Sequence, residues 1–478
     1  MYPAAMLSAS RSGIIACGVS PDYTVDELAH ALTVSKASCL IATENNWQRA
    51  CGAADKVGLA RDRILCFDEV DGDPSRRSIR SLIRATKERG DASLIAPFQL
   101  PPGKTTSQVC AYLGFSSGTT GLPKGVMISH ANVIAQCLQV LQLTTPDLDQ
   151  ILAALPFYHI TGVMHQLHLP MVLNANVYVL SGFTMERMLR TVEKYKIKEL
   201  LLVPPILIRL VRERDLVKKY DLSHVRRFTS GAAPLSNEIL GLLEKQFPGT
   251  GFKQAYGMTE SCSCVTLHPP SMYSYRYASR VGGVVASTEV RIVDPETNRD
   301  CSAGQPGEIW ARGPQITMGY IGNPQATAET FDADGFLHTG DIGYFDSDGL
   351  LSVTDRIKEM IKVKGIAVAP AEIENLLLGH PDVVDCAVCG IPDERAGERP
   401  KAFVVLHPRH NQSQTSVARD LIEYVKSNKT RHKWISEVEV INEIPKSAAG
   451  KILRKKFRQP DRQVGLIVRE EKTSSSRL

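Results

Sequence analysis

Apolar positions along most of the chain alternate between two spacings. Runs rich in β-branched residues predict strands at 109–115 and 197–203, and apolar residues three and four positions apart predict an amphipathic helix at 186–195. Strands that alternate with helices in this way are typical of an α/β protein. The first part of the chain is therefore predicted to contain parallel-rich sheets covered by helices.

The pattern changes at Glu289. From there, short strands closed by Gly or Asp follow one another in VRIVD, GEIWARG, DGFLHTGD and DSDGLLSVTD, which predicts a β-rich subdomain. Beyond Asp355 and Arg356 a compact α+β unit is expected. Its predicted elements are helices at 371–378 and 417–426 and strands at 387–390 and 402–406.

These changes divide the chain into a large N-terminal domain and a small C-terminal domain, because 478 residues exceed one ordinary core. We place the large domain at 1–354 and the small domain at 359–460. The remaining residues, 461–478, are charged and Ser-rich, with only Val464 to Val468 apolar enough to pack. They are predicted to form a flexible tail.

Composition and charge exclude several classes of protein. Hydrophobic residues make up 43% and charged residues 22%, so the chain is globular rather than disordered. The net charge of +5 is modest and the basic residues are mixed with acids, so nucleic acid is not an expected partner. The 11 Cys lack zinc-ligand spacing, which favours reduced thiols in an intracellular compartment. Pro204 and Pro205 interrupt the most apolar run, so no membrane span is predicted.

The segment from Phe115 to Gly125, FSSGTTGLPKG, carries most of the chemical information. Hydroxyl residues, glycines and one lysine follow a predicted strand. Such a loop brings backbone N–H groups, hydroxyls and an ammonium group against a polyphosphate, because glycine permits close approach. Its spacing differs from the GxxxxGK[ST] P-loop, and the alternative interpretation is a flexible Ser/Gly turn.

SSGTTGLPKGV resembles the phosphate-loop signature of the acyl-adenylating superfamily, which includes acyl-CoA synthetases, peptide-synthetase adenylation domains and beetle luciferases. Later segments agree in order: QAYGMTE with the adenine and phosphate motif, TGD with the ribose motif, DRIKEMIKVKGIAVAPA with the hinge and coenzyme A segment, and PKSAAGKIL with the catalytic lysine loop. The 4-coumarate:CoA ligase-like branch is the most similar. The resemblance implies a large AMP-binding domain, a small mobile domain, and ATP, Mg²⁺, coenzyme A and a carboxylic acid as cofactors and substrates.

The resemblance also implies which residues bind the nucleotide. Tyr256 is expected to stack on adenine, Asp341 to accept bonds from both ribose hydroxyls, and Arg356 to reach the sugar or a phosphate. A core aromatic side chain and a Gly-Asp turn are the structural alternatives for Tyr256 and Asp341. The implied nucleotide-binding residues are Ser116, Ser117, Gly118, Thr119, Thr120, Gly121, Lys124, Gln254, Tyr256, Gly257, Thr259, Asp341, Arg356 and Lys451.

Four residues are implied in catalysis, namely Lys451, Thr259, His159 and Lys362. A carboxylate that attacks the α-phosphate of ATP brings two anions together, so Lys451 and the Thr259 hydroxyl are expected to neutralise charge at phosphorus. His159 is placed near the carboxylate, with a structural His as the alternative. Glu260 is implied in binding Mg²⁺, which prefers one or two carboxylates plus phosphate oxygens. The four basic neighbours of Lys451 are expected to be merely solvated: Lys446, Arg454, Lys455 and Lys456.

One site is implied to run two half-reactions. A hinge at 355–358, with Lys358 as its pivot, is expected to turn the small domain, so that the lysine loop leaves and the segment from Lys362 to Gly365 arrives. Lys364 and Gly365 are then expected to bind coenzyme A. Ala367 stands where this branch commonly has Gln, and thioester formation is expected to be altered.

The implied substrate pocket departs from the same branch. Ala255 replaces a more usual Gly and adds a methyl group at the end of the pocket. Thr161, His165, Ser263 and Cys264 differ from the residues of a hydroxycinnamate pocket. We therefore expect a different aromatic acid or a medium aliphatic acid rather than 4-coumarate. The residues assigned to the pocket are His159, Thr161, Ala255, Ser263 and Cys264.

Two other functions stay open. The second hypothesis is an adenylating enzyme with the same first half-reaction but another acceptor. Such an enzyme passes the acyl group to a carrier-protein thiol or oxidises the adenylate with oxygen. The similarity begins at Arg11, so an N-terminal piece is expected to be missing, and an inactive relative is the third hypothesis.

The end of the chain carries a candidate address. Its last three residues, Ser476, Arg477 and Leu478, approximate the Ser-Lys-Leu peroxisomal signal. A peroxisomal import receptor is therefore an expected partner, and the cytoplasm is the location expected without it.

Overall fold

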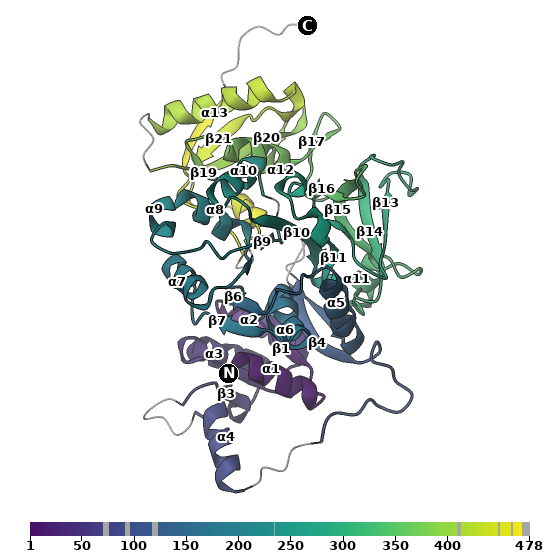
Figure 1. Ribbon diagram of the computed structural model, residues 1–478. Coiled ribbons are helices and arrows are strands. Elements are labelled where there is room, and N and C mark those ends of the chain that lie inside the picture. Colours follow the sequence, from purple (N-terminus) through teal and green to yellow (C-terminus); the bar gives the residue numbers. More distant parts are fainter. Residues whose placement is uncertain are drawn as a thin grey trace.

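A computed structural model of the chain describes residues 1–69, 76–90, 96–116, 123–233, 235–408, 413–447, 450–459 and 462–470. Helices and mixed sheets alternate through it, so the predicted α/β fold class is confirmed. Figure 1 shows the C-terminal part, from Ile361 onward, lying above α8 and α10. The helices are α1 (Tyr2–Arg11), α2 (Val25–Ser35), α3 (Trp47–Val57), α4 (Ile79–Glu88), α5 (His130–Gln142), α6 (Leu169–Leu173), α7 (Met185–Tyr195), α8 (Pro204–Arg212), α9 (Arg214–Val217), α10 (Asn237–Gln246), α11 (Pro324–Thr330), α12 (Pro370–Leu378) and α13 (Gln414–Asn428).

A five-stranded sheet forms the centre of the large part. Its order is β12-β11-β10-β9-β8, in which β8, β9 and β10 are parallel and β10, β11 and β12 are antiparallel. The strands are β8 (Glu199–Leu201), β9 (Arg227–Ser230), β10 (Gly251–Met258), β11 (Ser263–Leu267) and β12 (Gly283–Val284). Apolar side chains of α7, α8 and α10 pack with Phe228 and Phe252 of this sheet in one continuous core. The strand predicted at 197–203 is shorter than expected, because Pro204 starts α8 soon after β8.

Smaller sheets surround this centre. A three-stranded sheet has the order β1-β4-β5, and two pairs of strands, β2-β3 and β6-β7, are parallel. Their strands are β1 (Ala16–Gly18), β2 (Leu40–Ala42), β3 (Ile64–Cys66), β4 (Cys110–Ser116), β5 (Lys124–Ser129), β6 (Gln150–Ala153) and β7 (Asn176–Val179). The strand predicted at 109–115 is confirmed as β4, and the helix predicted at 186–195 is confirmed as α7.

The β-rich region predicted from Glu289 is an antiparallel sheet of order β13-β14-β15-β16. Its strands are β13 (Glu289–Val293), β14 (Gly307–Arg312), β15 (Leu337–Phe345) and β16 (Leu351–Arg356). The last strand ends at Arg356, where the pattern of the sequence also changed. This sheet therefore carries the predicted ribose motif on one strand and the start of the predicted hinge on the next.

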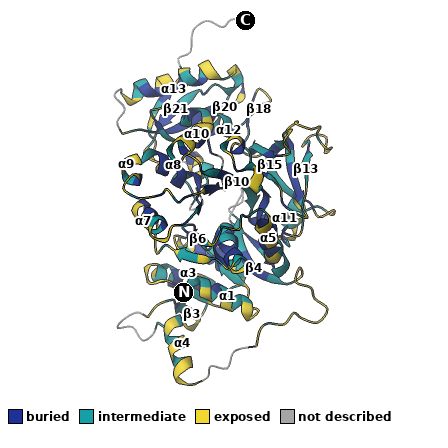
Figure 2. Ribbon diagram, in the orientation of Figure 1, coloured by how far each residue is buried: buried dark blue, intermediate teal, exposed yellow. Residues whose placement is uncertain are grey.

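The C-terminal part is a six-stranded sheet with α12 and α13 packed on it. Figure 2 shows that α13 turns a buried face to the sheet and an exposed face away from it. The strands are β17 (Ile361–Val363), β18 (Ile366–Val368), β19 (Val383–Asp393), β20 (Gly397–Leu406), β21 (Glu437–Val440) and β22 (Leu466–Arg469). The flexible tail predicted at 461–478 is wrong for β22, which pairs with β21 and buries Val468. A strand of only four residues forms there because pairing with β21 supplies its backbone hydrogen bonds.

Contacts between the two parts hold the small one above α8. Arg212, the last residue of α8, donates from Nη1 to the Val384 carbonyl at 2.8 Å and from Nη2 to the Val383 carbonyl at 3.0 Å. Within the described residues, no helix is long and apolar enough to cross a membrane.

Candidate active site

Four of the predicted nucleotide-binding residues, Tyr256, Asp341, Arg356 and Lys451, come together; we call them the Asp341 group. The Tyr256 hydroxyl donates to Asp341 Oδ2 at 2.8 Å, and Arg356 Nε lies 2.9 Å from Asp341 Oδ1. Lys451 is close enough to interact electrostatically with Arg356 and Asp341. The chain segments that supply these side chains are far apart in the sequence, so only the fold assembles the group.

Local structure explains how Asp341 and Arg356 meet. They lie directly opposite each other in the antiparallel ladder of β15 and β16. Side chains of such cross-strand partners on one face are neighbours, about 5 Å apart at Cβ, which suits an ion pair. The Thr339 hydroxyl accepts from the Asp341 N–H at 3.1 Å and so fixes the TGD turn in front of the carboxylate.

Burial sets the protonation equilibria of the group. Burial raises the pKa of Asp341 and outweighs the opposite effect of Arg356. Burial is also the main reason why the pKa of Lys451 falls to about 8, and the positive charge of Arg356 adds to it. An ammonium group with little water around it interacts more strongly with an incoming phosphate than a solvated one.

The loop that carries Lys451 packs on the start of α8. Gly450 has a φ of +81°, and a Cβ at this position would lie 3.0 Å from Pro205 Cδ. Glycine therefore permits both the left-handed backbone and the close contact. The Lys451 N–H donates to Ser447 Oγ at 3.2 Å, which steadies the loop from its other side.

Ser116 and Lys124 frame the phosphate side of the site. They are paired residues at the ends of β4 and β5. Ser116 Oγ is buried and has no hydrogen-bond partner in the described part of the chain, as expected of a hydroxyl that binds a phosphate. β4 also contacts Thr259, since a Cβ at Gly114 would lie 2.8 Å from Thr259 Cγ2. The other predicted loop residues, Ser117, Gly118, Thr119, Thr120 and Gly121, lie outside the described residues.

Glu260, the predicted magnesium ligand, is buried near Lys124 at the start of β5. The Tyr320 hydroxyl donates to Glu260 Oε1 at 2.8 Å, and Lys124 Nζ lies 4.7 Å from the centre of the Tyr320 ring. No group of three or more His, Cys, Asp or Glu residues within the described ranges is arranged to hold a metal ion. A single carboxylate fits Mg²⁺ only in combination with phosphate oxygens, which is how Mg²⁺ binds to nucleotides.

The residues predicted to line the acyl pocket form two polar contacts. His159 Nδ1 lies 3.2 Å from Thr161 Oγ1 and accepts from the Thr161 N–H at 3.3 Å, and burial lowers the pKa of His159. His165, in a π-helical turn (Gly162–His168), has its Nε2 3.1 Å from Ser263 Oγ and 3.7 Å from Cys264 Sγ. The pocket residues Ala255 and Cys264 belong to one apolar cluster with Val140, Leu169, Leu267 and Val285. The structure thus brings Ala255, Ser263 and Cys264 together.

Gly257 and Gln254 have structural tasks that the motif alone does not reveal. A Cβ at Gly257 would lie 1.5 Å from the Ser263 carbonyl oxygen, so β10 and β11 approach too closely there for any side chain. The Gln254 side chain is buried and donates to the Ala278 carbonyl. The Gln254 amide is therefore not part of the Asp341 group.

The predicted coenzyme A segment is a β-hairpin on the small part. Lys362 pairs with Ala367 across β17 and β18, and Lys364 and Gly365 form its two-residue turn with φ of 51° and 79°. Two positive φ values are typical of a type I′ turn, which favours Gly at the second position. Lys362, Lys364 and Gly365 are exposed. No hydrogen bond or ion pair among the described residues joins them to the Asp341 group, and the structure does not bring these residues together with it.

The predicted hinge adjoins a buried ionic network that is centred on Arg454. Lys358 itself is exposed. Arg454 Nη1 lies 2.7 Å from Glu359 Oε2 and its Nη2 lies 2.6 Å from Glu374 Oε1. Asp355 accepts from the Ala371 N–H at 3.0 Å.

This network corrects the expectation that the basic neighbours of Lys451 are merely solvated. Arg454 is mostly buried between two carboxylates, and Lys446 forms an ion pair with Asp385 at 2.7 Å. Only Lys455 and Lys456 are exposed as expected. The partners Glu359, Glu374 and Asp385 lie up to 95 positions away, so no local signal distinguished the paired cations from the solvated ones.

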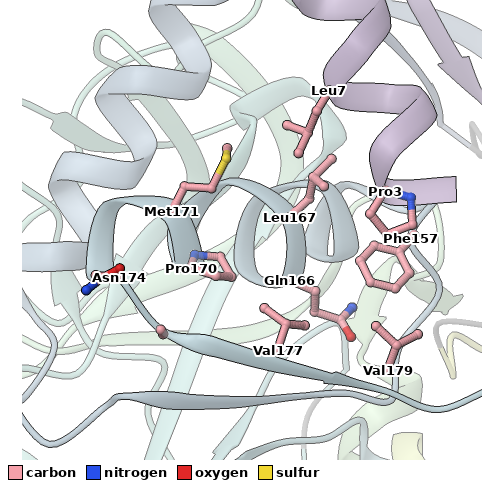
Figure 3. A pocket seen from close by; sticks show the side chains of 11 residues that line it. Pro3, Leu7, Phe157, Gln166, Leu167, Pro170, Met171, Asn174, Val177 and Val179 are labelled. Carbon is pink, nitrogen blue, oxygen red and sulfur yellow. The ribbon is translucent and has the colours of Figure 1, made fainter. Parts of the chain in front are cut away.

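A cavity of about 390 Å³ lies away from the Asp341 group, between α1, α6 and β7 (Figure 3). None of its lining side chains is ionisable, and none is a predicted site residue. Its lining residues are Pro3, Leu7, Phe157, Gln166, Leu167, Pro170, Met171, Asn174, Ala175, Val177 and Val179. A cavity without a charged or catalytic group is no candidate for the phosphate chemistry.

Tyr320 is a site residue that the sequence did not indicate. It connects Glu260 with Lys124, but it lies 60 positions from Glu260 in a turn without a recognised motif. Its only sequence signal is an aromatic residue between glycines, MGYIG, which is typical of many turns.

Comparisons with known proteins agree with this geometry. The sequence matches the AMP-binding enzyme family over residues 1–321 and the AMP-binding enzyme C-terminal domain over residues 372–451. The 4-coumarate--CoA ligase 1 of Arabidopsis thaliana is 36% identical over 466 residues, which cover 95% of this chain and 80% of the relative. The 4-coumarate--CoA ligase-like 9 of the same plant is 35% identical over 461 residues, which cover 95% of this chain and 77% of the relative.

A solved structure is similar over nearly the same length. The anthranilate CoA ligase AuaEII in complex with anthranoyl-AMP has a TM-score of 0.81 at 26% identity, and the match covers 94% of this chain and 83% of that one. The family match extends through more than half of the chain and includes the strands that carry Tyr256 and Lys124. The chain belongs to the AMP-binding enzyme family.

Proposed function

We propose that the protein is an ATP-dependent acid:CoA ligase that forms an acyl-AMP from a carboxylic acid and then an acyl-CoA thioester, releasing pyrophosphate and AMP. The observation that carries the proposal is the Asp341 group, in which a mostly buried Lys451 stands beside Asp341, Arg356 and Tyr256. The relatives named above are CoA ligases, and one solved relative holds an acyl-AMP.

In the first half-reaction the residues bind and orient two anions. Asp341 and Arg356 hold the ribose, while Ser116, Lys124 and Thr259 line the phosphates. Lys451 donates to the oxygens that gain charge as the carboxylate attacks the α-phosphate and pyrophosphate leaves. Because Lys451 is poorly solvated, its charge is worth more to the transition state than that of an exposed lysine.

Mg²⁺ is the expected metal of this reaction. Glu260 would bind it together with phosphate oxygens, and the ion would neutralise charge on the leaving pyrophosphate. The Tyr320 hydroxyl orients the Glu260 carboxylate for this role.

In the second half-reaction the hairpin with Lys362, Lys364 and Gly365 replaces the Lys451 loop. The exposed position of this hairpin and the polar junction at 355–358 support a rotation of the small domain. The thiolate of coenzyme A then attacks the acyl carbon, and AMP leaves. Ala367, beside Lys362 in the ladder, is expected to alter this step relative to relatives that have Gln.

The acid is proposed to be a medium aliphatic acid or an aromatic acid other than 4-coumarate. Ala255, Ser263 and Cys264 form one wall of the pocket, and His165 places an imidazole against Ser263. Burial lowers the pKa of His165 to about 4, so the ring is neutral at physiological pH and adds no charge to this wall.

The test is pyrophosphate release from ATP and Mg²⁺ with a panel of aryl and aliphatic acids, with and without coenzyme A. Acid-dependent release is expected, and coenzyme A should accelerate it by removing the adenylate. Lys451→Ala should slow release about a hundredfold or more, since it removes a charge aimed at the transition state. The matched control is Lys455→Ala, an exposed lysine of the same segment.

Each alternative has its own outcome in this assay. Acyl transfer only to a carrier-protein thiol would identify that thiol as the acceptor in place of coenzyme A. Oxygen consumption with emission of light would identify oxygen as the acceptor. ATP binding without release with any acid would identify an inactive relative and overturn the proposal.

We further propose that Ser476, Arg477 and Leu478 direct the protein to peroxisomes. These residues lie outside the described part of the chain, so the proposal rests on the sequence and on the acyl-CoA chemistry. A fluorescent fusion that lacks them should move from peroxisomes to the cytosol. An unchanged distribution would remove the targeting proposal.

A further inference from the structure

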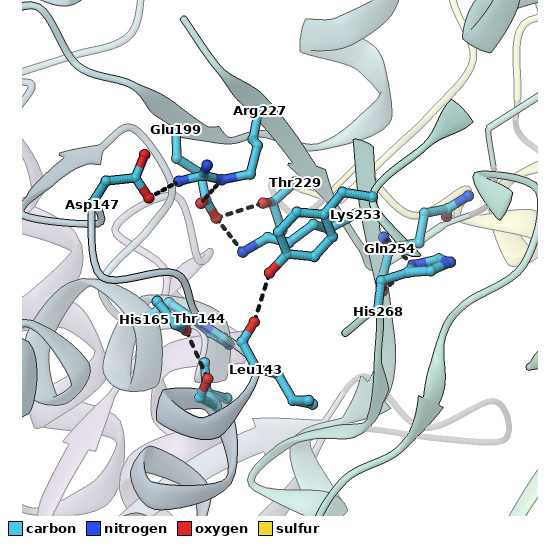
Figure 4. Close-up of polar contacts among 12 residues, drawn as sticks. Leu143, Thr144, Asp147, His165, Glu199, Arg227, Thr229, Lys253, Gln254 and His268 are labelled. Carbon is cyan, nitrogen blue, oxygen red and sulfur yellow. Dashed lines mark hydrogen bonds and ion pairs between the residues drawn. The ribbon is translucent and has the colours of Figure 1, made fainter. Parts of the chain in front are cut away.

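A second cluster of charges is buried near the predicted acyl-pocket residue His165, and it has no part in the chemistry described above. Arg227 Nε lies 2.8 Å from Glu199 Oε2, Arg227 Nη2 lies 2.7 Å from Asp147 Oδ1, and Lys253 Nζ forms an ion pair with Glu199 Oε1 (Figure 4). The Thr229 hydroxyl donates to the same Glu199 oxygen at 2.9 Å. The side chains of Lys253 and Glu199 are only 4% and 6% exposed, so water solvates neither charge.

Packing alone does not explain this cluster. Removing two charges from water costs about as much as their attraction returns, and apolar side chains of similar size often stabilise a core at least as well. Burial acts to raise the pKa of Glu199, but Lys253 and Arg227 outweigh it and lower the pKa overall. The carboxylate is therefore ionised, and the two cations and two carboxylates of the cluster balance.

A cavity of about 40 Å³ opens onto the cluster. Glu199, Thr229, Lys253 and His165 line it on its polar side, and Leu148 and Leu201 are among the aliphatic residues that line the rest. That volume accommodates about three water molecules or a small polar group of a ligand. A ligand in this cavity would therefore find hydrogen-bonding groups on one side and aliphatic side chains on the other.

The predicted acyl-pocket residues adjoin this cavity, since Val140, Leu169 and Leu267 line it and also belong to the apolar cluster of Ala255 and Cys264. Ala255 and Lys253 lie on one face of β10, because side chains alternate along a strand. The strand is half-buried at Gly257 and Ala255 and buried at Lys253. At about 3.3 Å per residue, Gly257 and Lys253 are about 13 Å apart, which matches an extended acyl chain of medium length. His165 belongs to both regions, since it lines the cavity and its Nε2 lies 3.1 Å from Oγ of Ser263, a predicted acyl-pocket residue.

Lys253 keeps hydrogen-bonding capacity for a ligand. Its ammonium group has three N–H donors. Among the described residues, Glu199 is its one hydrogen-bonding partner, and the Tyr273 ring, with its centre 5.3 Å away, is a weaker second contact. A ligand carboxylate would add an uncompensated negative charge to the balanced cluster. A neutral ligand oxygen can accept a hydrogen bond from Lys253 without adding a charge.

We infer that the preferred acid is a medium-chain acid with a neutral oxygen function, a hydroxyl or carbonyl group, at the end remote from its carboxylate, and that Lys253 and Glu199 bind this group. The inference rests on the proposed function and names the substrate class of the same site. The carboxylate lies near Gly257 and Thr259, and the remote oxygen fills the cavity beside Lys253.

Three acids of one chain length test the inference: an ω-hydroxy fatty acid, the unsubstituted fatty acid and the dicarboxylic acid. With the wild-type protein, kcat/KM for pyrophosphate release should be at least tenfold higher with the ω-hydroxy acid than with either of the others. In the double variant Glu199→Gln/Lys253→Met, which removes both charges of the pair together, the ratio of ω-hydroxy to unsubstituted acid should fall to about one. Thermal unfolding reports whether the variant is folded.

Two further variants keep the test decisive. Lys401→Met removes another buried, paired lysine, in the small part, and should leave the ratio unchanged. If the double variant does not fold, Thr229→Val takes its place, and a severalfold smaller ratio is expected because one polar wall group is lost.

The outcomes separate this inference from the proposed function. Release with all three acids at equal kcat/KM, or a preference that persists in the double variant, overturns the inference and leaves the ligase proposal standing. A preference for the dicarboxylic acid also overturns the inference. It would mean that the cluster has an excess positive charge for the second carboxylate of the substrate, whereas we infer that its charges balance. No release with any acid overturns both.

Discussion

At the scale of single residues, burial decides which side chains have useful chemistry. Lys451 is withdrawn from water beside a carboxylate and another cation. The same effect keeps His165 neutral, with a pKa of about 4. The motif predicted the identity of Lys451, whereas its lowered pKa results from burial and, in addition, from Arg356, 95 positions earlier in the chain.

The first prediction concerns pH. Burial and Arg356 favour the neutral amine of Lys451, so its proton leaves near pH 8 rather than at the usual value for lysine. The charged form is therefore present below this pH and lost above it. We expect kcat/KM for ATP to fall as the pH rises past about 8, measured by pyrophosphate release with a saturating acid.

The control for this prediction is Lys451→Arg. A guanidinium group stays protonated throughout this range, so the decrease on the alkaline side should shift to higher pH even if the overall rate is lower. A decrease that keeps its position in the variant would mean that another group titrates.

At the scale of elements, one strand positions residues of several sites, and a close backbone approach fixes its pairing with the next strand. The strand β10 carries Lys253, Ala255 and Tyr256 into three different surroundings: the charged cluster, the acyl pocket and the Asp341 group. Its register with β11 shifts after Tyr256, where β11 contains an extra residue. At Gly257 the two strands lie too close for a side chain.

The second prediction is therefore that Gly257→Ala lowers the free energy of unfolding. Its Cβ would overlap the Ser263 carbonyl, so the strands must separate, at a cost of about 1–3 kcal/mol or more. The measurement is the midpoint of urea unfolding. Gly241→Ala in α10 is the matched control, since a Cβ there meets nothing within 4 Å, and it should raise the stability by about 0.5–1 kcal/mol.

At the scale of the whole molecule, the orientation of the small part decides which half-reaction is possible. In this arrangement Lys451 stands in the Asp341 group and the hairpin of Lys362 is exposed. Arg212 fastens the arrangement by donating to the carbonyls of Val383 and Val384. These bonds must break if the small part turns about 355–358.

The third prediction is that Arg212→Met slows adenylation. Hydrogen bonds from a charged group contribute about 1.5–3 kcal/mol each, so losing them should populate other orientations and slow pyrophosphate release about tenfold or more. Release is measured without coenzyme A, and thioester formation from preformed acyl-AMP is measured separately and should not slow.

Arg209→Met is the matched control for this variant. Arg209 lies on the same helix but pairs with Glu213 within the large part, so its loss should change neither rate. Equal slowing of both half-reactions in Arg212→Met would indicate a general loss of structure instead of a change in orientation.

The sequence by itself determined the fold class and many of the residues of the Asp341 group. Alternating strand and helix patterns and short motifs are local, and local sequence suffices for them because turn geometry and periodicity depend on neighbouring residues. That is why the helix at 186–195 and the ribose motif could be predicted, and why Asp341 and Lys451 were identified.

Only the tertiary structure decided the features that depend on partners distant in the sequence. Arg454 and Lys446 look like solvated cations until Glu359, Glu374 and Asp385 are brought to them. Val468 looks like part of a tail until β21 offers a ladder. In the sequence, nothing distinguishes Lys253 from an exposed lysine, and only the fold buries it beside Glu199. Burial and ion pairing are relations between residues distant in the sequence, and local sequence patterns do not show which of these residues meet.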